Sequence, residues 1–428
     1  MRISVIGTGY VGLVTSVVFA KLGHTVYGID IDEKKIKKLK KGIAPFYEPG
    51  LQKLLKENAA KKRLFFTNSY KETISKSEAV FICVGTPSKK NGDYNLSYIM
   101  DSVKSVAENL NDYTVIVIKS TVPPSTNTKV KKLIDGITKI PYDLASVPEF
   151  LKEGTAIADA FNPSRVVIGT DSKKAERKLL EIHKKIKAPR VLCSTKSAQL
   201  IKYAANAFLA TKISYINSIA YLCEKTGADI NDVSRGLGLD PRIGSKFLNA
   251  GLGYGGSCFP KDVSALIAFS KRLGFDFQFL KEVDDVNKKQ VDLFINKIKN
   301  AFHNNLEDKT LSILGLAFKP ETDDVREARS ILIIKKLLNL GATIKAYDPI
   351  AMDNARNELS NVEFSKTSYE ALKDSSALLL ITEWEEFSKL DFKKVYSLMK
   401  EKNIFDGRNF LDYKKLKKIG FSYFGIGR

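Results

Sequence analysis

Cysteine and histidine are scarce in this chain. Its 428 residues include four cysteines and three histidines. Cys83, Cys193, Cys223 and Cys258 lie far apart in the sequence, and no two of them form a C-x-x-C pair. Zinc sites and disulfide frameworks require closely or regularly spaced ligands, so the sequence argues against both and we expect no metal site. We expect Cys83, Cys193 and Cys223 to be small buried hydrophobic residues.

Long hydrophobic runs are also missing. No apolar stretch approaches the roughly 18–20 residues that are needed to cross a bilayer. The first residues, MRISVIGTGYVGLVTSVVFAKLG, look superficially like a signal peptide but lack a small-residue cleavage site. We therefore expect a cytoplasmic protein without a membrane partner. The apolar fraction of 44% is ordinary for a globular protein, and the length predicts two or three domains.

Acidic residues are too few to balance the basic ones. Lys and Arg number 69 against 48 Asp and Glu, which gives a formal net charge of +21. Such a field attracts nucleic acids, anionic membranes or phosphorylated substrates. The lysines are scattered over what look like solvent faces of helices, and no nucleic-acid-binding signature accompanies them. We interpret the charge as a lysine-rich surface that also favours a small anionic substrate, and we expect no nucleic-acid partner; a nucleic-acid-binding protein is the alternative that charge alone suggests.

The N-terminal segment has the pattern of a dinucleotide-binding unit. A β-branched strand is followed by Gly7, Gly9 and Gly12 in G-x-G-x-x-G spacing, then by a helix and a second strand that ends at Asp30. The first glycine allows the tight turn, the second lets the backbone approach a pyrophosphate, and the third lets the helix pack on the strand. The pyrophosphate would meet the helix N-terminus. Asp30 would accept from a ribose 2′-hydroxyl, which favours NAD over NADP.

Further strands and helices alternate along the first 195 residues. Two apolar strands, at 78–87 and 113–124, lead into Thr86 and Thr121. These threonines either line the cofactor crevice or serve only as turn and capping residues. Glu149 and Glu153 are four residues apart, so they would share one face if their segment were helical. An ordinary solvated helix face is the alternative for that pair.

The second half of the chain begins with helices and returns to alternation. Residues 196–300 have helical spacing, with Lys202 and Asn206 four apart on one face. This long helix would be a natural dimer surface. From about residue 308 strands and helices alternate again, without G-x-G-x-x-G, so this half would bind a different nucleotide or none. Lys319, Arg326 and Arg408 would meet phosphate or uracil there, unless they form only surface salt bridges.

We therefore predict an α/β fold with two Rossmann-like doubly wound domains joined by a central long helix. The boundaries that we expect are 1–195 for a dinucleotide-binding domain, 196–305 for a central helical domain, and 306–428 for a second Rossmann-like domain. The stretch GGSCFPKD places Cys258 directly after a glycine-rich approach. A simple alcohol dehydrogenase needs a hydride acceptor and a base but no thiol, so this cysteine requires an explanation.

Taken together, these stretches resemble the UDP-glucose 6-dehydrogenase family of nucleotide-sugar dehydrogenases. The resemblance runs over nearly the whole chain and rests on the motifs GTGYVG, VGTP, STVPP, PEFLKEG, KYAANAFLATKISYINSIA, DPRIGSKFLNAGLGYGGSCFPKD, GLAFKPETDDVRE, YDP, TEWEEF and FDGRN. It implies two successive oxidations of a sugar alcohol to a carboxylate with two NAD+. The thiolate of Cys258 would add to the intermediate aldehyde, and hydride loss would then leave a thioester that water cleaves.

The resemblance also implies roles for individual residues. Lys202, assisted by Asn206, would stabilise oxyanion character, while Asp262 and Thr121 would handle the proton of the alcohol step. Glu149 would be the base for thioester hydrolysis. The candidate catalytic residues are Cys258, Lys202, Asn206, Asp262, Thr121 and Glu149.

The expected binding residues fall into two sets. The cofactor-binding candidates are Gly7, Gly9, Val11, Gly12, Asp30, Lys35, Thr86, Thr121, Glu153 near the nicotinamide, and Arg326 near the pyrophosphate. The substrate-binding candidates are Glu149, Phe150, Leu151, Lys202, Asn206, Arg242, Phe247, Gly255, Lys319 and Arg408. Arg242 would reach the sugar site of a neighbouring subunit, so the resemblance implies a functional homodimer.

Two enzyme alternatives stay open beside UDP-glucose oxidation. A sister enzyme acting on GDP-mannose or a UDP-N-acetylhexosamine would have the same architecture and chemistry, because pocket shape alone separates these sugars. A two-electron hydroxyacid dehydrogenase would share the first domain and the long helix, but it would need neither Cys258 nor a second nucleotide-binding half.

Overall fold

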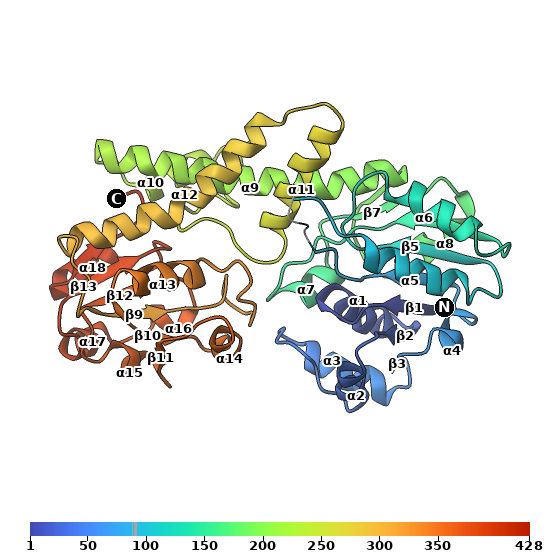
Figure 1. The fold of residues 1–428 in the computed structure, drawn as a ribbon, viewed down its shortest axis with the longest axis horizontal. Helices are drawn as coiled ribbons and strands as arrows, with labels where there is room; N and C mark the ends of the chain where they lie inside the picture. The colour runs from blue at the N-terminus through green and yellow to red at the C-terminus, as the bar shows by residue number, and fades with distance from the viewer. Residues whose placement is uncertain (88, 90–91) are drawn as a thin grey trace. The chain divides into compact units, whose positions relative to one another are not determined.

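The computed structural model describes residues 1–87, 89 and 92–428, which form two compact units (Figure 1). The first unit comprises Met1–Ala205 and the second Asn206–Arg428. Helix α9 (Thr195–Thr226) begins in the first unit and ends in the second. Each unit contains its own twisted sheet with helices on both faces, so the predicted pair of doubly wound domains and the long helix are confirmed.

The sheet of the first unit has the strand order of a dinucleotide-binding fold. The order is β3-β2-β1-β4-β5-β6-β7-β8, with parallel pairing except between β6 and β7. The strands are β1 (Arg2–Ile6), β2 (Thr25–Ile29), β3 (Leu64–Thr67), β4 (Ala79–Ile82), β5 (Thr114–Ile118), β6 (Tyr142–Ser146), β7 (Val166–Gly169) and β8 (Arg190–Cys193). The helices are α1 (Tyr10–Lys21), α2 (Glu33–Lys40), α3 (Leu51–Ala60), α4 (Lys71–Ile74), α5 (Ser97–Ala107), α6 (Thr126–Asp135), α7 (Ala156–Phe161) and α8 (Lys173–Ile182). The strand order reverses between β1 and β4, because β2 and β3 extend the sheet on one side of β1 and β4 and β5 extend it on the other. Such folds bind their ligands at this switch point.

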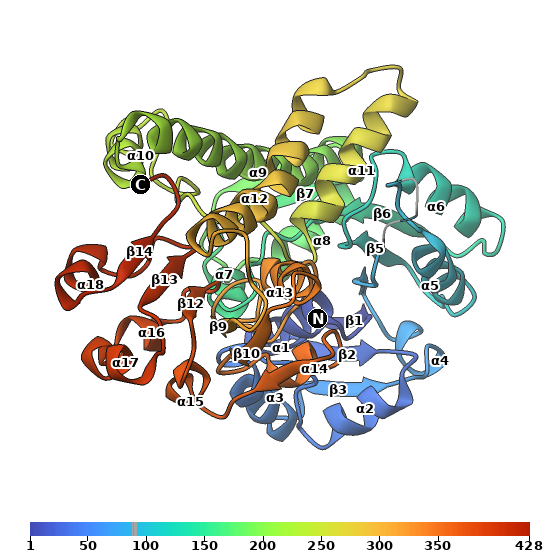
Figure 2. The same cartoon turned by 60° about the vertical axis from the view of Figure 1, so that its left-hand side comes forward.

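The strands of this sheet are apolar on both faces because helices cover both. In β5, Val115 and Val117 join the core formed with α1, α3 and α8, whereas Ile116 and Ile118 join the core formed with α5 and α6 (Figure 2). Alternating side chains point to opposite faces of a strand, so an uninterrupted β-branched run fits a sheet that is buried on both sides.

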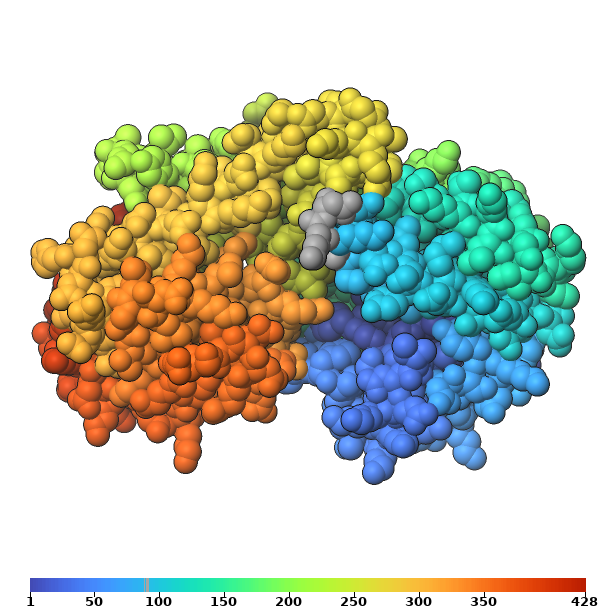
Figure 3. All heavy atoms as spheres, in the orientation of Figure 1, coloured from blue at the N-terminus to red at the C-terminus, as the bar shows by residue number. Residues whose placement is uncertain are grey.

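The second unit repeats the same strand order after a helical segment. That segment consists of the second part of α9, followed by α10 (Ile230–Gly238), α11 (Phe259–Arg272) and α12 (Gln278–Ala301). The sheet order is β11-β10-β9-β12-β13-β14, with parallel pairing throughout. Within this unit, helix α12 packs against α13 (Arg329–Asn339), and the gold and orange atoms of these parts of the chain lie side by side in Figure 3. The strands are β9 (Thr310–Leu314), β10 (Thr343–Tyr347), β11 (Val362–Phe364), β12 (Ala377–Leu380), β13 (Asn403–Asp406) and β14 (Ser422–Phe424). The helices are α13 (Arg329–Asn339), α14 (Met352–Arg356), α15 (Ser368–Leu372), α16 (Glu385–Ser388), α17 (Phe392–Leu398) and α18 (Tyr413–Ile419).

The helix that would put Glu149 and Glu153 on one face does not form. The segment that carries Glu149 and Glu153 is not helical, so the two carboxylates do not share a helix face. Strand β6 ends at Ser146, and Pro148 disfavours the helical conformation of the residue before it. Gly154 then adopts a φ of 80°, which also lies outside the helical region. The segment is a loop that continues from the carboxyl end of a central strand.

Among the residues that the structure describes, no helix combines the length and apolar character that a bilayer crossing requires. Within the same residues, no group of three or more His, Cys, Asp and Glu side chains could hold a metal ion.

Candidate functional site

The glycine-rich turn between β1 and α1 has the shape of a phosphate cradle. Gly7 has a φ of 88°, and a Cβ at Gly12 would lie 1.8 Å from the carbonyl oxygen of Gly7. These two glycines are therefore required by the turn itself and by the close packing of helix on strand. A Cβ at Gly9, in contrast, would meet no atom within 4 Å. Gly9 leaves open space at the N-terminus of α1, where backbone N–H groups and the helix dipole favour a pyrophosphate.

Asp30 lies at the carboxyl end of β2, beside this turn. Its Oδ2 accepts from the backbone N and Oγ1 of Thr8, at 2.8 and 2.7 Å, and from Lys35 Nζ at 3.1 Å. Burial opposes the charge of Asp30, but the hydrogen bonds from Thr8, Asp32 and Lys35 outweigh burial and hold the pKa of this carboxyl below its ordinary value. An ionised carboxylate at this position fits the ribose hydroxyls of NAD and repels a 2′-phosphate. The residues of the turn and of β2 therefore fit the cofactor.

The loops that follow β4 and β5 are tied to each other. The hydroxyl of Thr86 donates to the carbonyl of Thr121 at 3.1 Å, and that of Ser120 donates to the carbonyl of Val84 at 2.7 Å. Thr86 is buried. The structure thus brings Thr86 and Thr121 together beside the point where the strand order reverses.

Glu149 and Lys202 form a buried ion pair within the first unit. Lys202 Nζ, on α9, lies 3.1 Å from Glu149 Oε1, and the two side chains are 5% and 7% exposed. The other oxygen of Glu149 accepts from the backbone N of Leu151 at 2.5 Å, and Lys202 also lies 5.4 Å from the centre of the Phe150 ring. A third group is Lys119, directly after β5. Burial lowers the pKa of its ammonium group, and the negative charge of Glu149 acts in the opposite direction. The pair sets a carboxylate and an ammonium group side by side in a dry environment, which suits electrostatic and proton-transfer chemistry.

Cys258 and an acid–amide–lysine cluster lie together at the start of α11 in the second unit. Cys258 is the exposed N-cap residue of this helix, with its Sγ 3.7 Å from the hydroxyl of Ser257. Four residues on, the buried Asp262 accepts from Asn206 Nδ2 and from Lys261 Nζ, each at 2.5 Å. A helix N-terminus and a nearby cation both favour a thiolate.

The glycines before Cys258 are required by contacts within the protein. A Cβ at Gly255 would lie 2.2 Å from the carbonyl oxygen of Glu327, and one at Gly256 would lie 2.7 Å from the ring of Phe318. The backbone N of Gly256 donates to the carbonyl of Arg326 at 3.1 Å. The cysteine loop is therefore packed directly against the 318–328 loop, which follows β9.

Three basic residues that the sequence singled out stand on loops after β9 and β13. Arg408 Nε donates to the carbonyl of Ile381 at 2.6 Å and lies 3.2 Å from Glu383 Oε2, so this side chain ties two neighbouring loops together. Arg326 pairs with Asp324 through two nitrogens and is 64% exposed, while Lys319 Nζ lies 5.5 Å from the ring of Phe318. Both loops extend from the carboxyl edge of the second sheet, beside the reversal of strand order between β9 and β12.

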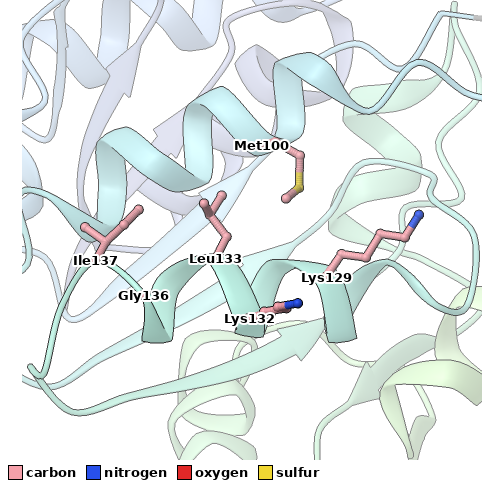
Figure 4. A pocket seen from close by; sticks show the side chains of 6 residues that line it. All are labelled: Met100, Lys129, Lys132, Leu133, Gly136 and Ile137. Atoms are coloured by element: carbon pink, nitrogen blue, oxygen red, sulfur yellow. The ribbon is translucent and has the colours of Figure 1, made fainter.

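Arg242 and Phe247 occupy two different places in the second unit. Phe247 has a φ of 66°, which is uncommon for a non-glycine residue, and its ring lies 6.2 Å from that of Phe259 beside Cys258. Arg242 is exposed, pairs with Asp240, and lines an apolar pocket of about 530 Å³ between α9, α10 and α12. Another pocket, on α5 and α6 of the first unit, is lined by none of the predicted site residues (Figure 4).

Sequence reasoning missed three polar residues that contact the predicted ones. Thr8 holds Asp30, Glu48 binds the backbone just after Glu153, and Lys119 lies close to Glu149. Lys119 gave a signal, because a lysine directly after an apolar strand is unusual unless it meets a partner. Glu48 gave none, since its backbone partners Gly154 and Ala156 are more than 100 residues away in the sequence.

Family models match three successive stretches of the chain. They are the NAD binding domain of the UDP-glucose/GDP-mannose dehydrogenase family at residues 1–187, its central domain at 196–289, and its UDP binding domain at 312–413. The chain is 46% identical to UDP-glucose 6-dehydrogenase TuaD of Bacillus subtilis (strain 168), covering 100% of this chain and 93% of that protein. It is 43% identical to a UDP-glucose 6-dehydrogenase of Rickettsia conorii, covering 100% and 99%.

Two solved structures share the whole fold. A UDP-glucose dehydrogenase from the archaeon Pyrobaculum islandicum matches with a TM-score of 0.93 and 36% identity, covering 100% of this chain and 97% of that one. A UDP-D-ManNAc dehydrogenase from Pyrococcus horikoshii matches with a TM-score of 0.89 and 27% identity, covering 100% and 99%.

Proposed function

The chain belongs to the UDP-glucose/GDP-mannose dehydrogenase family, and on this basis we propose that it oxidises the C6 alcohol of UDP-glucose to the carboxylate of UDP-glucuronate. Two NAD+ each accept one hydride, and one water molecule supplies the second carboxylate oxygen. The observation that carries the proposal is the exposed Cys258 at the N-terminus of α11, one turn from the buried Asp262, in a chain that has an NAD-binding domain. An exposed thiol at that point can add to the aldehyde, which allows the oxidation to continue to the carboxylate.

The first oxidation removes a proton from the C6 hydroxyl and a hydride from C6. Asp262, held by Asn206 and Lys261, receives the proton through a water molecule together with Thr121. The ammonium group of Lys202 stabilises the developing negative charge on the sugar oxygen. The buried Glu149, 3.1 Å from that ammonium group, holds it in place.

The second oxidation is made possible by a covalent bond to the protein. The thiolate of Cys258 attacks the aldehyde carbon and forms a C–S bond, which makes this carbon tetrahedral. Loss of the second hydride from the thiohemiacetal leaves a thioester. Glu149 then takes a proton from water as the water attacks the thioester carbon, the C–S bond breaks, and the thiol is regenerated with the acid.

The test is the amount of NADH that forms from limiting UDP-glucose with excess NAD+. We expect two NADH per sugar. A yield of one would mean that oxidation stops at the aldehyde, and the role of Cys258 would then be wrong. If no NADH forms, GDP-mannose and the N-acetylated UDP-sugars become the substrates to try. Cys258→Ser should abolish acid formation with cofactor binding intact, whereas Cys193→Ser, at a half-buried cysteine on an edge strand, should behave as the wild type.

We also propose that the enzyme is a homodimer in which Arg242 reaches the partner's sugar site. The exposed Phe208, Tyr215 and Phe279 line the same pocket as Arg242, and burial of such side chains against a second copy would favour association. Mixing Arg242→Ala with Cys258→Ser tests the exchange of Arg242, because only a shared site regains activity from two inactive partners. Inactive mixtures despite proven exchange of subunits would place Arg242 outside the neighbouring site.

The cytoplasm is the compartment that we propose for the enzyme. Cys258 carries an exposed thiol, whereas Cys83 and Cys223 are buried. A reducing compartment keeps a reactive thiol such as that of Cys258 available. Fractionation of the source cells checks this, and activity confined to an oxidising compartment would contradict it.

A further inference from the structure

Glu48 is a buried carboxylate with four donors around it. It lies on the loop between α2 and α3 and is 4% exposed. Its Oε1 accepts from the backbone N of Ala156 at 2.7 Å and more distantly from that of Ile157, at 3.4 Å. Its Oε2 accepts from the backbone N of Gly154 at 2.6 Å and from the hydroxyl of Tyr10. Every contact is a donor to the carboxylate, so both oxygens are fully used.

Tyr10 connects this carboxylate to the cofactor-binding turn. It is the first residue of α1, directly after Gly9, and its hydroxyl also accepts from the backbone N of Gly154 at 3.1 Å. Burial, and then the hydrogen bond to Glu48, raise the pKa of Tyr10 far above its ordinary value, so the hydroxyl keeps the proton that it donates. The charge of Glu153 raises this pKa further, which places the Glu153 carboxylate near Tyr10.

The anchored segment is the one that most needs an anchor. Residues 147–155 form neither helix nor strand, and they carry Glu149 and Glu153. At one end the backbone N of Val147 donates to the carbonyl of Ile118 beside β6, at 3.1 Å. At the other end the backbone N of Gly154 and that of Ala156, the first residue of α7, donate to Glu48. A loop with few backbone bonds of its own depends on such bonds to keep a fixed shape.

We propose that Glu48 and Tyr10 are positioning residues, which hold the segment with Glu149 and Glu153 against the first turn of α1, where the cofactor pyrophosphate binds. This inference rests on the proposed function. Cofactor binding and the placement of the two carboxylates are thereby coupled through one buried hydrogen-bonded unit. A displacement of about 1 Å in a reacting group costs on the order of 100-fold in rate, so the anchor affects the chemistry without touching the substrate.

The donors around Glu48 predict that an amide will not replace this carboxylate. In Glu48→Gln, the NH2 group must point either at the N–H of Ala156 or at the N–H of Gly154. In both orientations a buried donor faces a donor, which destabilises the anchored arrangement. Tyr10→Phe is the milder change, because it removes one oxygen and leaves the ring that packs 5.0 Å from that of Phe46.

The experiment compares Glu48→Gln, Tyr10→Phe and the double variant with the wild type and with Glu57→Gln. Glu57 is a matched control, since it lies on the neighbouring α3 and its carboxylate pairs with Lys21 at the surface, at 2.8 Å. Steady-state kinetics give kcat and KM for NAD+, and UDP-glucose with deuterium at C6 gives the isotope effect on kcat. NADH per sugar is measured for each protein.

We expect each single variant to lose about tenfold or more in kcat/KM for NAD+, with a raised KM and a larger isotope effect, because misplaced carboxylates slow the hydride step. The double variant should lose little more than either single one, since both act on one unit. A fall in kcat alone, with KM and isotope effect unchanged, would mean only a smaller folded fraction and would overturn the inference; additive losses would also overturn it. A wild type that yields fewer than two NADH per UDP-glucose refutes the proposed function instead. If Glu48→Gln does not fold, Tyr10→Phe still decides the question.

Discussion

Replacing Lys202 by methionine separates the structural from the catalytic role of the buried ion pair. The ammonium lies 3.1 Å from the carboxylate of Glu149, and both side chains are almost fully buried. At an effective dielectric constant of about 20, two unit charges at this distance attract each other by roughly 5 kcal/mol. Methionine keeps the apolar stem and removes the charge, so the buried Glu149 loses the ammonium group that pairs with it directly, and Lys119 is the positive charge that remains nearby. Breaking a buried pair in this way costs about 3–5 kcal/mol.

A loss of that size is measurable as a fall in thermal stability. One kcal/mol shifts the Tm of a domain of this length by about 2–4 °C, so Lys202→Met should lower the transition of the first unit by roughly 10 °C. Removing both charges should restore most of the lost thermal stability, because the double variant Lys202→Met, Glu149→Gln no longer has one member of the pair buried without the other. Activity should not return, since the double variant lacks both groups that the chemistry needs.

Differential scanning calorimetry and NADH formation, measured on the same preparations, check both statements. The reasoning on the pair would be refuted if the double variant were no more stable than Lys202→Met alone, because the two groups would then not be coupled. The catalytic role of Lys202 would be refuted if Lys202→Met, assayed at a low temperature at which it stays folded, formed NADH at the wild-type rate.

Three other predictions concern the cofactor cradle and a buried histidine. Asp30→Ala should weaken NAD+ binding and narrow its advantage over NADP+ in titrations; an unchanged preference would place the ribose contact elsewhere. Gly9→Ala should fold normally but bind NAD+ weakly, whereas Gly12→Ala should lose stability as well, because its Cβ would lie 1.8 Å from a backbone oxygen; equal behaviour would contradict this division. Burial lowers the pKa of His183 to about 3, so the folded protein keeps the ring neutral while the unfolded chain binds a proton below about pH 6.5. Stability should therefore fall by about 2 kcal/mol between pH 8 and pH 5 on account of this group, and His183→Gln, unlike the exposed His303→Gln, should flatten the slope in denaturant unfolding.

The fold was predictable because its signals are local and repeated. The run TVIVI in β5 is apolar at successive positions, as a strand covered on both faces must be, and the glycine spacing after β1 has a steric cause that acts within a few residues. The conformation of the segment with Glu149 and Glu153 was left open by the sequence, for the opposite reason. Spacing by four says only that the residues would share a face if the segment were a helix, and here Pro148 and an anchor at Glu48 decide otherwise.

The chemical residues of the site were predictable where neighbours in sequence are also neighbours in space. Cys258, Lys261 and Asp262 lie on one turn at the start of α11, and the partner of Asp262, Asn206, was singled out by its place on the long helix. Contacts across long separations were not predictable. Thr8 against Asp30 spans 22 residues, and Glu48 against Ala156 spans 108. The sequence around Thr8 or around Glu48 contains no pattern that predicts its hydrogen-bond partner.

The glycines before Cys258 show what such a pattern can and cannot reveal. Their density indicates that something approaches the backbone too closely for a side chain, and the resemblance suggested the sugar. In the structure, the space that a Cβ of Gly255 would need is taken by the carbonyl of Glu327, and that of Gly256 by the ring of Phe318. Both neighbours belong to the loop that carries Lys319 and Arg326, so the glycines fix the cysteine loop against the loop expected to bind nucleotide phosphate. Glycine spacing thus reveals crowding but not its cause, and a substitution such as Gly255→Ala should displace the 318–328 loop even before any substrate is present.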